Sequence, residues 1–207
     1  MNVLIVGSTG TIGRELVKQA LANGHVVTAF ARDPAKLQIE DQKLTIARGD
    51  VMDSASLERV MPGQDIVLSA LGAGAKGGVR AAGTRNIIET MHKCGVRRFV
   101  SLSSLGVGKS RANLDFFWKY VMFGLLLRRA FADHVAQEQY IRESDLDWTI
   151  VRPGAYTDGE LTGDYRHGFP VTAKDIKLKI SRADVADFML SQLDNDSYLH
   201  MAPGLSY

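Results

Sequence analysis

The sequence has few of the features that mark specialised classes of protein. Its one cysteine, Cys94, among 207 residues excludes an internal disulfide and suits a reducing compartment. The formal net charge is only +2, which is too small to indicate binding to nucleic acid or to a membrane. The longest apolar stretch, residues 116–127, contains Lys119 and is too short to span a bilayer. The first residues read directly as a strand, without a secretion signal, so we expect a cytoplasmic protein.

What the sequence does contain is a strand, a glycine turn and a helix at its start. Residues 3–6 are aliphatic, and apolar residues over 12–21 recur at helical spacing. Between them lies a pattern of three glycines, G-x-x-G-x-x-G. The first permits a sharp turn, the second lets backbone N–H groups approach a phosphate, and the third lets helix and strand pack closely. An ordinary turn is the alternative, but this context favours a nucleotide site, with contacts at Gly7, Thr9, Gly10, Thr11, Ile12 and Gly13.

Further strands and helices alternate along the chain. Strands are predicted at residues 25–30, 44–47, 66–69, 98–102 and 148–151, and helices at 54–61, 79–94 and 113–143. A glycine-rich loop at 153–168, an edge strand at 176–180 and a helix capped by Ser181 follow. This alternation predicts an α/β fold with a doubly wound parallel sheet of the Rossmann type. We expect a single NAD(P)-binding domain over residues 1–207, with a small C-terminal elaboration on the substrate side.

The residues after the second strand bear on the choice of dinucleotide. A site selective for NAD places an acid there to hold the ribose 2′-hydroxyl, whereas a site selective for NADP places a cation. Arg32 is the first charged residue past the strand, and Lys36 follows one helical turn later. Because Arg32 can donate two charge-assisted bonds to a 2′-phosphate, we favour NADPH as the cofactor. Asp33 offers the opposite alternative, and a solvated surface arginine is a third interpretation.

Four further strand ends carry groups suited to the rest of a dinucleotide. Asp50 can accept from the adenine amino group while Val51 packs on the ring, although an acid at a helix N-terminus is the alternative. Small residues after the fourth strand let the backbone pass close to a ribose and phosphate. Serine hydroxyls after the fifth strand can reach the nicotinamide or substrate, with Ser104 as the candidate catalytic residue. The predicted cofactor contacts here are Asp50, Val51, Ala70, Leu71, Gly72, Ser103, Pro153, Gly154, Ala155 and Tyr156.

Together these segments resemble the atypical short-chain dehydrogenase/reductases. The motifs are the three glycines, Arg32-Asp33, Gly49-Asp50-Val51, Leu71-Gly72, Ser103-Ser104 and residues 147–153. Residues 161–165 followed by 180–190 resemble more particularly the biliverdin-IXβ reductase/flavin reductase branch. The resemblance covers essentially the whole chain and implies an NADPH-dependent reductase of flavins or linear tetrapyrroles. It also implies that Arg32 and Lys36 hold the 2′-phosphate, that Asp50 and Val51 hold the adenine, and that Ser104 lies beside the nicotinamide.

The chain departs from that branch at three places. The arginine that the branch commonly carries two residues after its Leu-Gly is Gly74 here, with Lys76 as the nearby cation. The histidine two residues after the strand-six proline is Ala155. Residues 105–129 are more apolar and aromatic than the branch leads us to expect. These departures leave the cofactor assignment intact and weaken the substrate assignment.

The aromatic stretch and the histidines are the remaining candidates for substrate or metal contacts. Phe117 and Trp118 are predicted to cover a planar substrate, a flavin or a bilin, with ordinary helix core as an equal alternative. His134 and His167 are the histidines nearest the expected cleft, but neither has a second histidine or cysteine at metal-binding spacing. We therefore predict no metal. His25, His92 and His200 are interpreted as structural or surface residues.

Two classes of function fit these observations. One is an NADPH-dependent oxidoreductase, monomeric or homodimeric, that acts on a small planar acceptor. The other is a non-catalytic NAD(P)-binding redox sensor like the nitrogen-metabolite-repressor-like proteins, which share the fold. No tyrosine is followed four residues later by lysine, so simple carbonyl reduction and sugar epimerisation lack their usual proton donor. An acceptor that delocalises the added charge needs less help from the protein, which favours a flavin or bilin.

Overall fold

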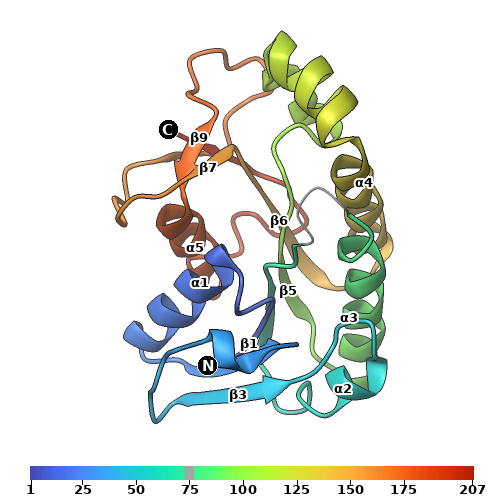
Figure 1. The fold of residues 1–207 in the computed structure, drawn as a ribbon, viewed down its shortest axis with the longest axis vertical. Coiled ribbons are helices and arrows are strands. Elements are labelled where there is room, and N and C mark those ends of the chain that lie inside the picture. Colours follow the sequence, from blue (N-terminus) through green and yellow to red (C-terminus); the bar gives the residue numbers. More distant parts are fainter. Residues whose placement is uncertain (73–76) are drawn as a thin grey trace.

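The computed structural model describes residues 1–72 and 77–207, so Gly74 and Lys76 lie outside the described residues. Its centre is an eight-stranded sheet in the order β3-β2-β1-β4-β5-β6-β10-β8 (Figure 1). Every pair is parallel except β10 with β8. The first six strands have the order of dinucleotide-binding folds, so the predicted doubly wound α/β fold is confirmed. The strands are β1 (Asn2–Val6), β2 (Val26–Ala31), β3 (Leu44–Arg48), β4 (Ile66–Ser69), β5 (Arg98–Leu102), β6 (Asp147–Pro153), β8 (Arg166–His167) and β10 (Gly204–Ser206).

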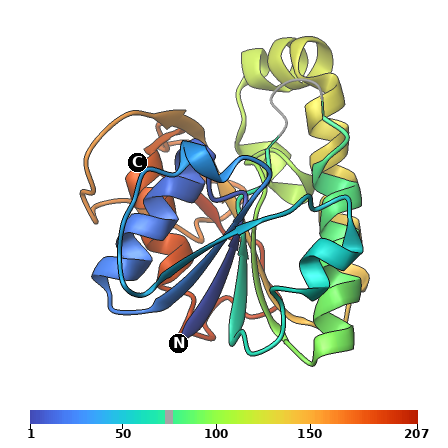
Figure 2. The ribbon, with the colours of Figure 1, turned by 60° about the horizontal axis from the view of Figure 1, so that its bottom comes forward.

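Helices cover both faces of this sheet (Figure 2). On one face α1 (Thr11–Ala22) packs against α5 (Arg182–Leu190). The other face carries α2 (Ser54–Glu58), α3 (Arg80–Cys94) and α4 (Arg128–Glu143). Because side chains alternate along a strand, β1 sends Val3 and Ile5 into one core and Leu4 and Val6 into the other. Burial on both faces explains why this strand reads as an unbroken apolar run.

The helix predicted over residues 113–143 is broken, so the expected continuity was wrong. A 3₁₀ turn, η3, covers Gly108–Asn113, a π-helix, η4, covers Phe117–Leu126, and α4 begins only at Arg128. Leu127, with φ −109° and ψ 18°, separates η4 from α4. In a π-helix residues five apart share one side, and the rings of Trp118 and Phe123 stack 5.7 Å apart. Nearly every residue here is apolar, so the sequence has no period that would reveal the break.

The C-terminal elaboration contains a second, two-stranded sheet. In it β7 (Ala155–Thr157) pairs in parallel with β9 (Lys179–Ser181). The strand predicted at 176–180 is therefore shifted, and it does not extend the main sheet. The loop predicted over 153–168 contains β7 and β8, and β10 was missed as well. Strands of two or three residues are too short to show an alternating pattern.

One carboxylate, that of Asp184, ties this elaboration to the main domain. Ser181 caps α5 as predicted, and its hydroxyl accepts from the Asp184 backbone N–H at 3.0 Å. The carboxylate accepts from the Tyr207 hydroxyl and from the N–H groups of Thr162 and Gly163. Burial disfavours its ionisation, but these bonds outweigh that cost and keep the pKa of Asp184 below its ordinary value. A loop, a helix and the C-terminal strand are thereby fixed together.

Candidate functional site

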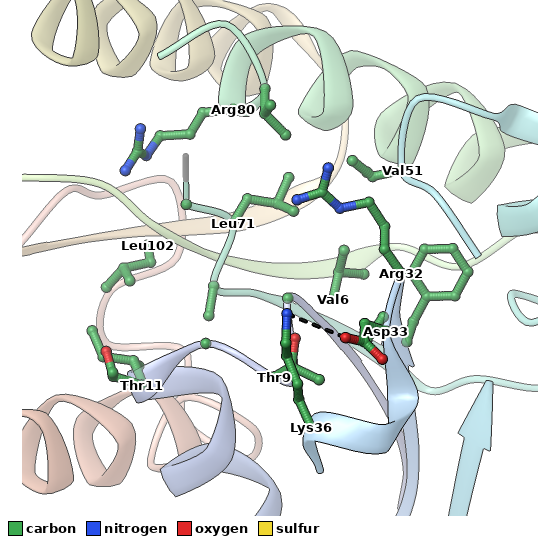
Figure 3. Close-up of a pocket in the computed structure, with 18 of the residues that line it drawn as sticks. Val6, Thr9, Thr11, Arg32, Asp33, Lys36, Val51, Leu71, Arg80 and Leu102 are labelled. Atoms are coloured by element: carbon green, nitrogen blue, oxygen red, sulfur yellow. Dashed lines mark ion pairs between the residues drawn. The ribbon is translucent and has the colours of Figure 1, made fainter. Parts of the chain in front are cut away.

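A cleft of about 400 Å³ lies at the carboxyl ends of β1, β2 and β4, above the first turn of α1 (Figure 3). Doubly wound sheets bind ligands in this crevice, at the point where the strand order reverses. Twelve of the residues predicted to contact a cofactor line it: Gly7, Thr9, Gly10, Thr11, Ile12, Arg32, Lys36, Val51, Ala70, Leu71, Gly72 and Tyr156. Residues far apart in the sequence thus converge on one cavity.

The turn between β1 and α1 has room for glycine alone. Gly7 has φ +83°, and a Cβ on it would lie 2.6 Å from the Ala70 carbonyl oxygen. A Cβ on Gly13, beneath the turn, would lie 2.2 Å from the Gly7 carbonyl oxygen. Gly10 is the N-cap of α1 and has no side chain to engage the first N–H groups of the helix. These N–H groups and the positive end of the helix dipole are suited to a phosphate group.

The first charged residues after β2 are Arg32, Asp33 and Lys36, and their arrangement leaves a cation available to bind an anion. The Lys36 ammonium lies 3.2 Å from the Asp33 carboxylate, in the exposed ion pair marked in Figure 3. Arg32 extends from the strand end toward the side of the cleft where Val51 lies (Figure 3). In the described part of the chain it makes no ion pair. Asp33 is therefore engaged, while the guanidinium of Arg32 keeps its donors for a ligand.

The two residues predicted to hold an adenine ring are placed differently. Val51 is buried and lines the cleft, and Gly83 on α3 leaves the space into which it packs. The Asp50 carboxylate instead accepts from the Met52 backbone N–H at 3.0 Å. The Ser56 hydroxyl donates to the Asp50 carbonyl oxygen at 2.7 Å. Asp50 thus shapes the turn after β3, and the N-cap of α2 is Asp53, so Asp50 does not have the helix-capping role that was its alternative.

Three side chains close the opposite end of the cleft: Arg80 from α3, His134 from α4 and Tyr156 from β7. Sequence reasoning named Tyr156, considered His134 and missed Arg80. Arg80 belongs to no motif, and the one available signal was its place at the start of the helix after the fourth strand. Because three separate elements supply these residues, only the fold brings them together.

Arg80 is a nearly buried cation with unused donors. Its side chain is 11% exposed, and its Nη1 lies 3.7 Å from the Asp133 carboxylate. That carboxylate also accepts from the backbone N–H groups of Arg80 and Ala81, at 3.1 and 3.0 Å. Among residues 1–72 and 77–207, Nε and Nη1 of Arg80 have no hydrogen-bond partner. Unpaired donors of a buried cation are costly. Arg80 also lines the cleft, so it places a fixed positive charge beside a bound ligand.

His134 and Tyr156 are both neutral near pH 7. Burial, followed by the charge of Arg80, lowers the pKa of His134 to about 4. Its Nδ1 has no hydrogen-bond partner among the described residues. Desolvation raises the pKa of Tyr156 to about 12, against the opposing effect of Arg80 and Arg182. The cleft therefore ends in one fixed cation and two uncharged groups that can each form a hydrogen bond.

A second, apolar pocket of about 380 Å³ adjoins the cleft through these three residues. Its walls include Leu114, Trp118, Phe123, Phe131 and Leu178. The predicted residues Ser104, Pro153, Gly154 and Ala155 line this pocket and are not among the residues of the cleft. The Ser104 hydroxyl donates to the Leu105 carbonyl oxygen at 3.2 Å. Trp118 faces the pocket, whereas its neighbour Phe117 is 52% exposed on the outside.

Ser103 has a structural position in this fold. Its hydroxyl is buried and donates to the Glu138 carboxylate at 2.7 Å. The same carboxylate forms a buried ion pair with Arg152, whose Nε lies 2.8 Å away. The predicted reach of this hydroxyl toward a nicotinamide is therefore corrected, because the side chain points into the interior between β5 and α4. Removing one member of a buried charge pair is strongly destabilising.

Neither a metal cluster nor a membrane-spanning helix occurs in the described ranges. Within residues 1–72 and 77–207, no three histidine, cysteine, aspartate or glutamate side chains are grouped so that they could hold a metal ion. In the same ranges, every helix is too short or too polar to cross a bilayer.

Two sequence relatives match most of this chain. It is 30% identical over 226 residues to UPF0659 protein C216.03 of Schizosaccharomyces pombe, covering 95% of this chain and 87% of the relative. It is also 30% identical over 176 residues to the uncharacterized chloroplastic protein At2g34460 of Arabidopsis thaliana. That match covers 78% of this chain but only 61% of the plant protein's length.

A solved structure agrees with the fold, and a family profile agrees with the dinucleotide cleft. The structure of ChuY, an anaerobillin reductase from Escherichia coli O157:H7, superposes with a TM-score of 0.79 at 24% identity. The superposition covers 99% of this chain and 96% of that one, and at this identity it shows a shared fold. The profile described as NAD(P)H-binding matches residues 7–196. The chain therefore belongs to this NAD(P)H-binding family of Rossmann-fold oxidoreductases, related to the atypical short-chain dehydrogenase/reductases.

Proposed function

We propose that the protein is an NADPH-dependent reductase that transfers hydride to a planar conjugated acceptor, a flavin or a linear tetrapyrrole. The observation that carries this proposal is that two cavities share one wall. The dinucleotide cleft adjoins an apolar, aromatic pocket, and both are lined by Arg80, His134 and Tyr156. A flat ring system in the second cavity would meet the end of the first, where hydride transfer requires close contact.

The residues of the cleft fit a dinucleotide. Gly7 and Gly13 pack too closely against neighbouring backbone to carry a Cβ, and the first turn of α1 offers uncapped N–H groups to a pyrophosphate. The preference for NADPH rests on Arg32, whose donors are available while Lys36 engages Asp33. Two charge-assisted bonds from a guanidinium to a 2′-phosphate would each contribute about 1.5–3 kcal/mol.

When bound, NADPH supplies the hydride from its nicotinamide ring. Arg80 would hold acceptor atoms at the junction, because its side chain lines both cavities. His134 and Tyr156 would donate hydrogen bonds as neutral groups, with Tyr156 retaining its proton because its pKa is about 12. Trp118, Phe123 and Phe131 would exclude water and contact a planar face. Ser104, proposed from the sequence as the catalytic residue, would act beside the nicotinamide from the wall of the pocket.

The nature of the acceptor follows from what surrounds it. The sequence has no tyrosine followed four residues later by lysine, so it lacks the proton-transfer pair that reduction of simple ketones uses. An extended π-system spreads the added charge and makes a smaller demand on the protein. ChuY, with the same fold, is named as an anaerobillin reductase, which supports a tetrapyrrole as one of the two acceptor classes.

Steady-state oxidation of NADPH tests the proposal. We expect absorbance loss with FMN or biliverdin, and none with a simple aldehyde, a ketone or a nucleotide sugar. NADH serves as the matched control for the cofactor, and protein without an acceptor serves as the control for uncoupled oxidation. Tight NADPH binding by calorimetry without turnover of either acceptor would contradict the proposal and favour the redox-sensor alternative.

A further inference from the structure

The apolar segment that walls the second pocket has an outer side with no protein against it in the described chain. Among the described residues fifteen large apolar side chains are exposed, and five of them lie within residues 116–126. Phe116 and Leu125 are each 73% exposed. The others are Phe117, Tyr120 and Leu126. Figure 2 shows the segment at one end of the molecule, projecting beyond the sheet and its helices. Apolar side chains gathered in this way mark an interaction surface.

The segment has two functional sides because it is a π-helix. Trp118 and Phe123 are five residues apart, and they face inward to line the pocket. Phe116 and Tyr120 form a separate ring pair on the outer side, with centroids 4.8 Å apart. Packing of the pocket therefore accounts for the inner aromatics and leaves the outer ones unexplained.

The charges beside this outer side are almost all positive. Residues 109–129 contain five cations and one carboxylate, a net charge of +4, whereas the whole chain has only +2. Lys109, Arg111, Arg128 and Arg129 are exposed, and the carboxylate belongs to Asp115. The segment and its flanking sequence thus carry more net positive charge than the whole chain. The net charge of +2 for the whole chain, from which we expected no membrane contact, does not show this local excess of positive charge.

We propose that residues 116–126 dock the protein on the surface of an anionic phospholipid bilayer. Aromatic and leucine side chains enter the boundary between headgroups and acyl chains, while flanking lysine and arginine contact lipid phosphates. A second copy of the chain suits this surface less well, because a self-complementary contact would bring the cations of both copies together. No span is required, since a π-helix of ten residues lies in the plane of the interface.

Docking would place the apolar pocket next to the lipid, because Trp118 and Phe123 lie on the inner side of the same helix. An acceptor that partitions into the bilayer could then enter without crossing bulk water. This consequence rests on the proposed function, whereas the docking itself does not. Vesicle binding is measured on the chain alone, without cofactor or acceptor, so either proposal can fail independently.

Sedimentation with vesicles tests the docking. We expect binding to vesicles of equal parts phosphatidylcholine and phosphatidylglycerol, weaker binding at high salt, and little binding to phosphatidylcholine alone. Leu125→Asn should reduce the partition coefficient about tenfold. Leu161→Asn is the matched control, since Leu161 is a leucine 51% exposed in the C-terminal elaboration, and it should leave binding unchanged.

The charge requirement has its own pair of variants. Arg128→Gln with Arg129→Gln should weaken binding to the anionic vesicles about fivefold for each cation removed. Arg59→Gln with Arg85→Gln removes one cation directly after α2 and one from α3, and it should have no effect. Circular dichroism at increasing temperature verifies that each variant is folded. Equal binding by Leu125→Asn and Leu161→Asn, indifference to lipid charge, or lipid-free dimerisation abolished by Leu125→Asn would each overturn the proposal.

Discussion

The cofactor cleft and the apolar pocket share three residues but are held in place differently. The cleft lies on the ends of buried parallel strands, and Val3 to Val6 of β1 are at most 1% exposed. The pocket is lined by η4, the start of α4, β7 and neighbouring loops. Among the described residues, the buried cluster beside it consists of Leu105, Leu114 and Ile176. Cofactor geometry is therefore fixed by the two main cores, whereas acceptor geometry depends in part on a small satellite core.

The largest effect should come from the glycine turn of the cleft. Gly13→Ala places a Cβ where the Gly7 carbonyl oxygen lies 2.2 Å away, so the backbone turn must move. We expect NADPH affinity to fall at least about a hundredfold, or about 3 kcal/mol, by titration calorimetry. Gly124→Ala is the control in the pocket segment, because its Cβ would meet its nearest neighbour at an ordinary 3.5 Å. Equal NADPH affinities for the Gly13→Ala and Gly124→Ala variants would contradict the proposal that the main cores alone fix the cofactor cleft.

The second effect concerns His134, which both regions share. Its pKa is about 4 in the folded protein, against an ordinary value of 6.5, so below pH 6.5 the unfolded chain binds the extra proton. Stability should therefore fall as the pH drops from 6.5 to 4, and this residue should contribute up to about 3 kcal/mol to the loss. His134→Gln should flatten this part of the profile of Tm against pH. Parallel profiles for the variant and the wild type would mean that His134 titrates normally.

The third effect separates the two dinucleotides within the cleft. Arg32→Ala should weaken NADPH binding about ten- to a hundredfold, because one or two charge-assisted bonds to the 2′-phosphate are lost. NADH should be almost unaffected, since it lacks that group. Titration of both cofactors against the variant measures this. An equal loss for each would show that Arg32 supports the fold of the cleft and does not select the phosphate.

The fourth effect should be confined to the pocket. Trp118→Ala removes a ring that lines the apolar cavity, so KM for the acceptor should rise about tenfold while NADPH affinity is unchanged. Phe117→Ala is the matched control, because its ring is exposed on the outside. A lower Tm for Trp118→Ala without any change in KM would make the segment ordinary core, the alternative that the sequence left open.

The smallest effects should come from single hydroxyl groups. Tyr156→Phe and Ser104→Ala should each retain flavin reduction within about fivefold of wild type, because a delocalised acceptor does not depend on one acid. Ser104→Ala should have the larger effect of the two if its hydroxyl helps to position the nicotinamide. Complete loss of turnover in Tyr156→Phe, with NADPH binding intact, would identify the tyrosine as a dedicated proton donor.

The same contrast explains how far the sequence could be interpreted. The strand, turn and helix around Gly7, Gly10 and Gly13 follow from local periodicity and from the conformational freedom of glycine. The structure places Gly7 and Gly10 at the cleft and packs Gly13 against the Gly7 carbonyl. Arg80 could not be found in this way, since its role depends on burial beside Asp133, which lies on another helix. Asp50 and Ser103 satisfy polar groups of their own surroundings. Hydrogen bonds of this kind join distant parts of the chain or form within one particular turn. They cannot be predicted from the spacing of residues in the sequence.

The carboxylate of Asp133 has one further consequence. Asp133 belongs to α4, and its carboxylate accepts from the first two N–H groups of α3. The start of α3, which positions Arg80, is therefore held by α4, which carries His134. A shift of α4 caused by an occupant of the apolar pocket would therefore displace the start of α3. The affinities for the acceptor and for the dinucleotide should then be thermodynamically linked. Because such linkage is reciprocal, each partner would change the binding of the other by the same factor.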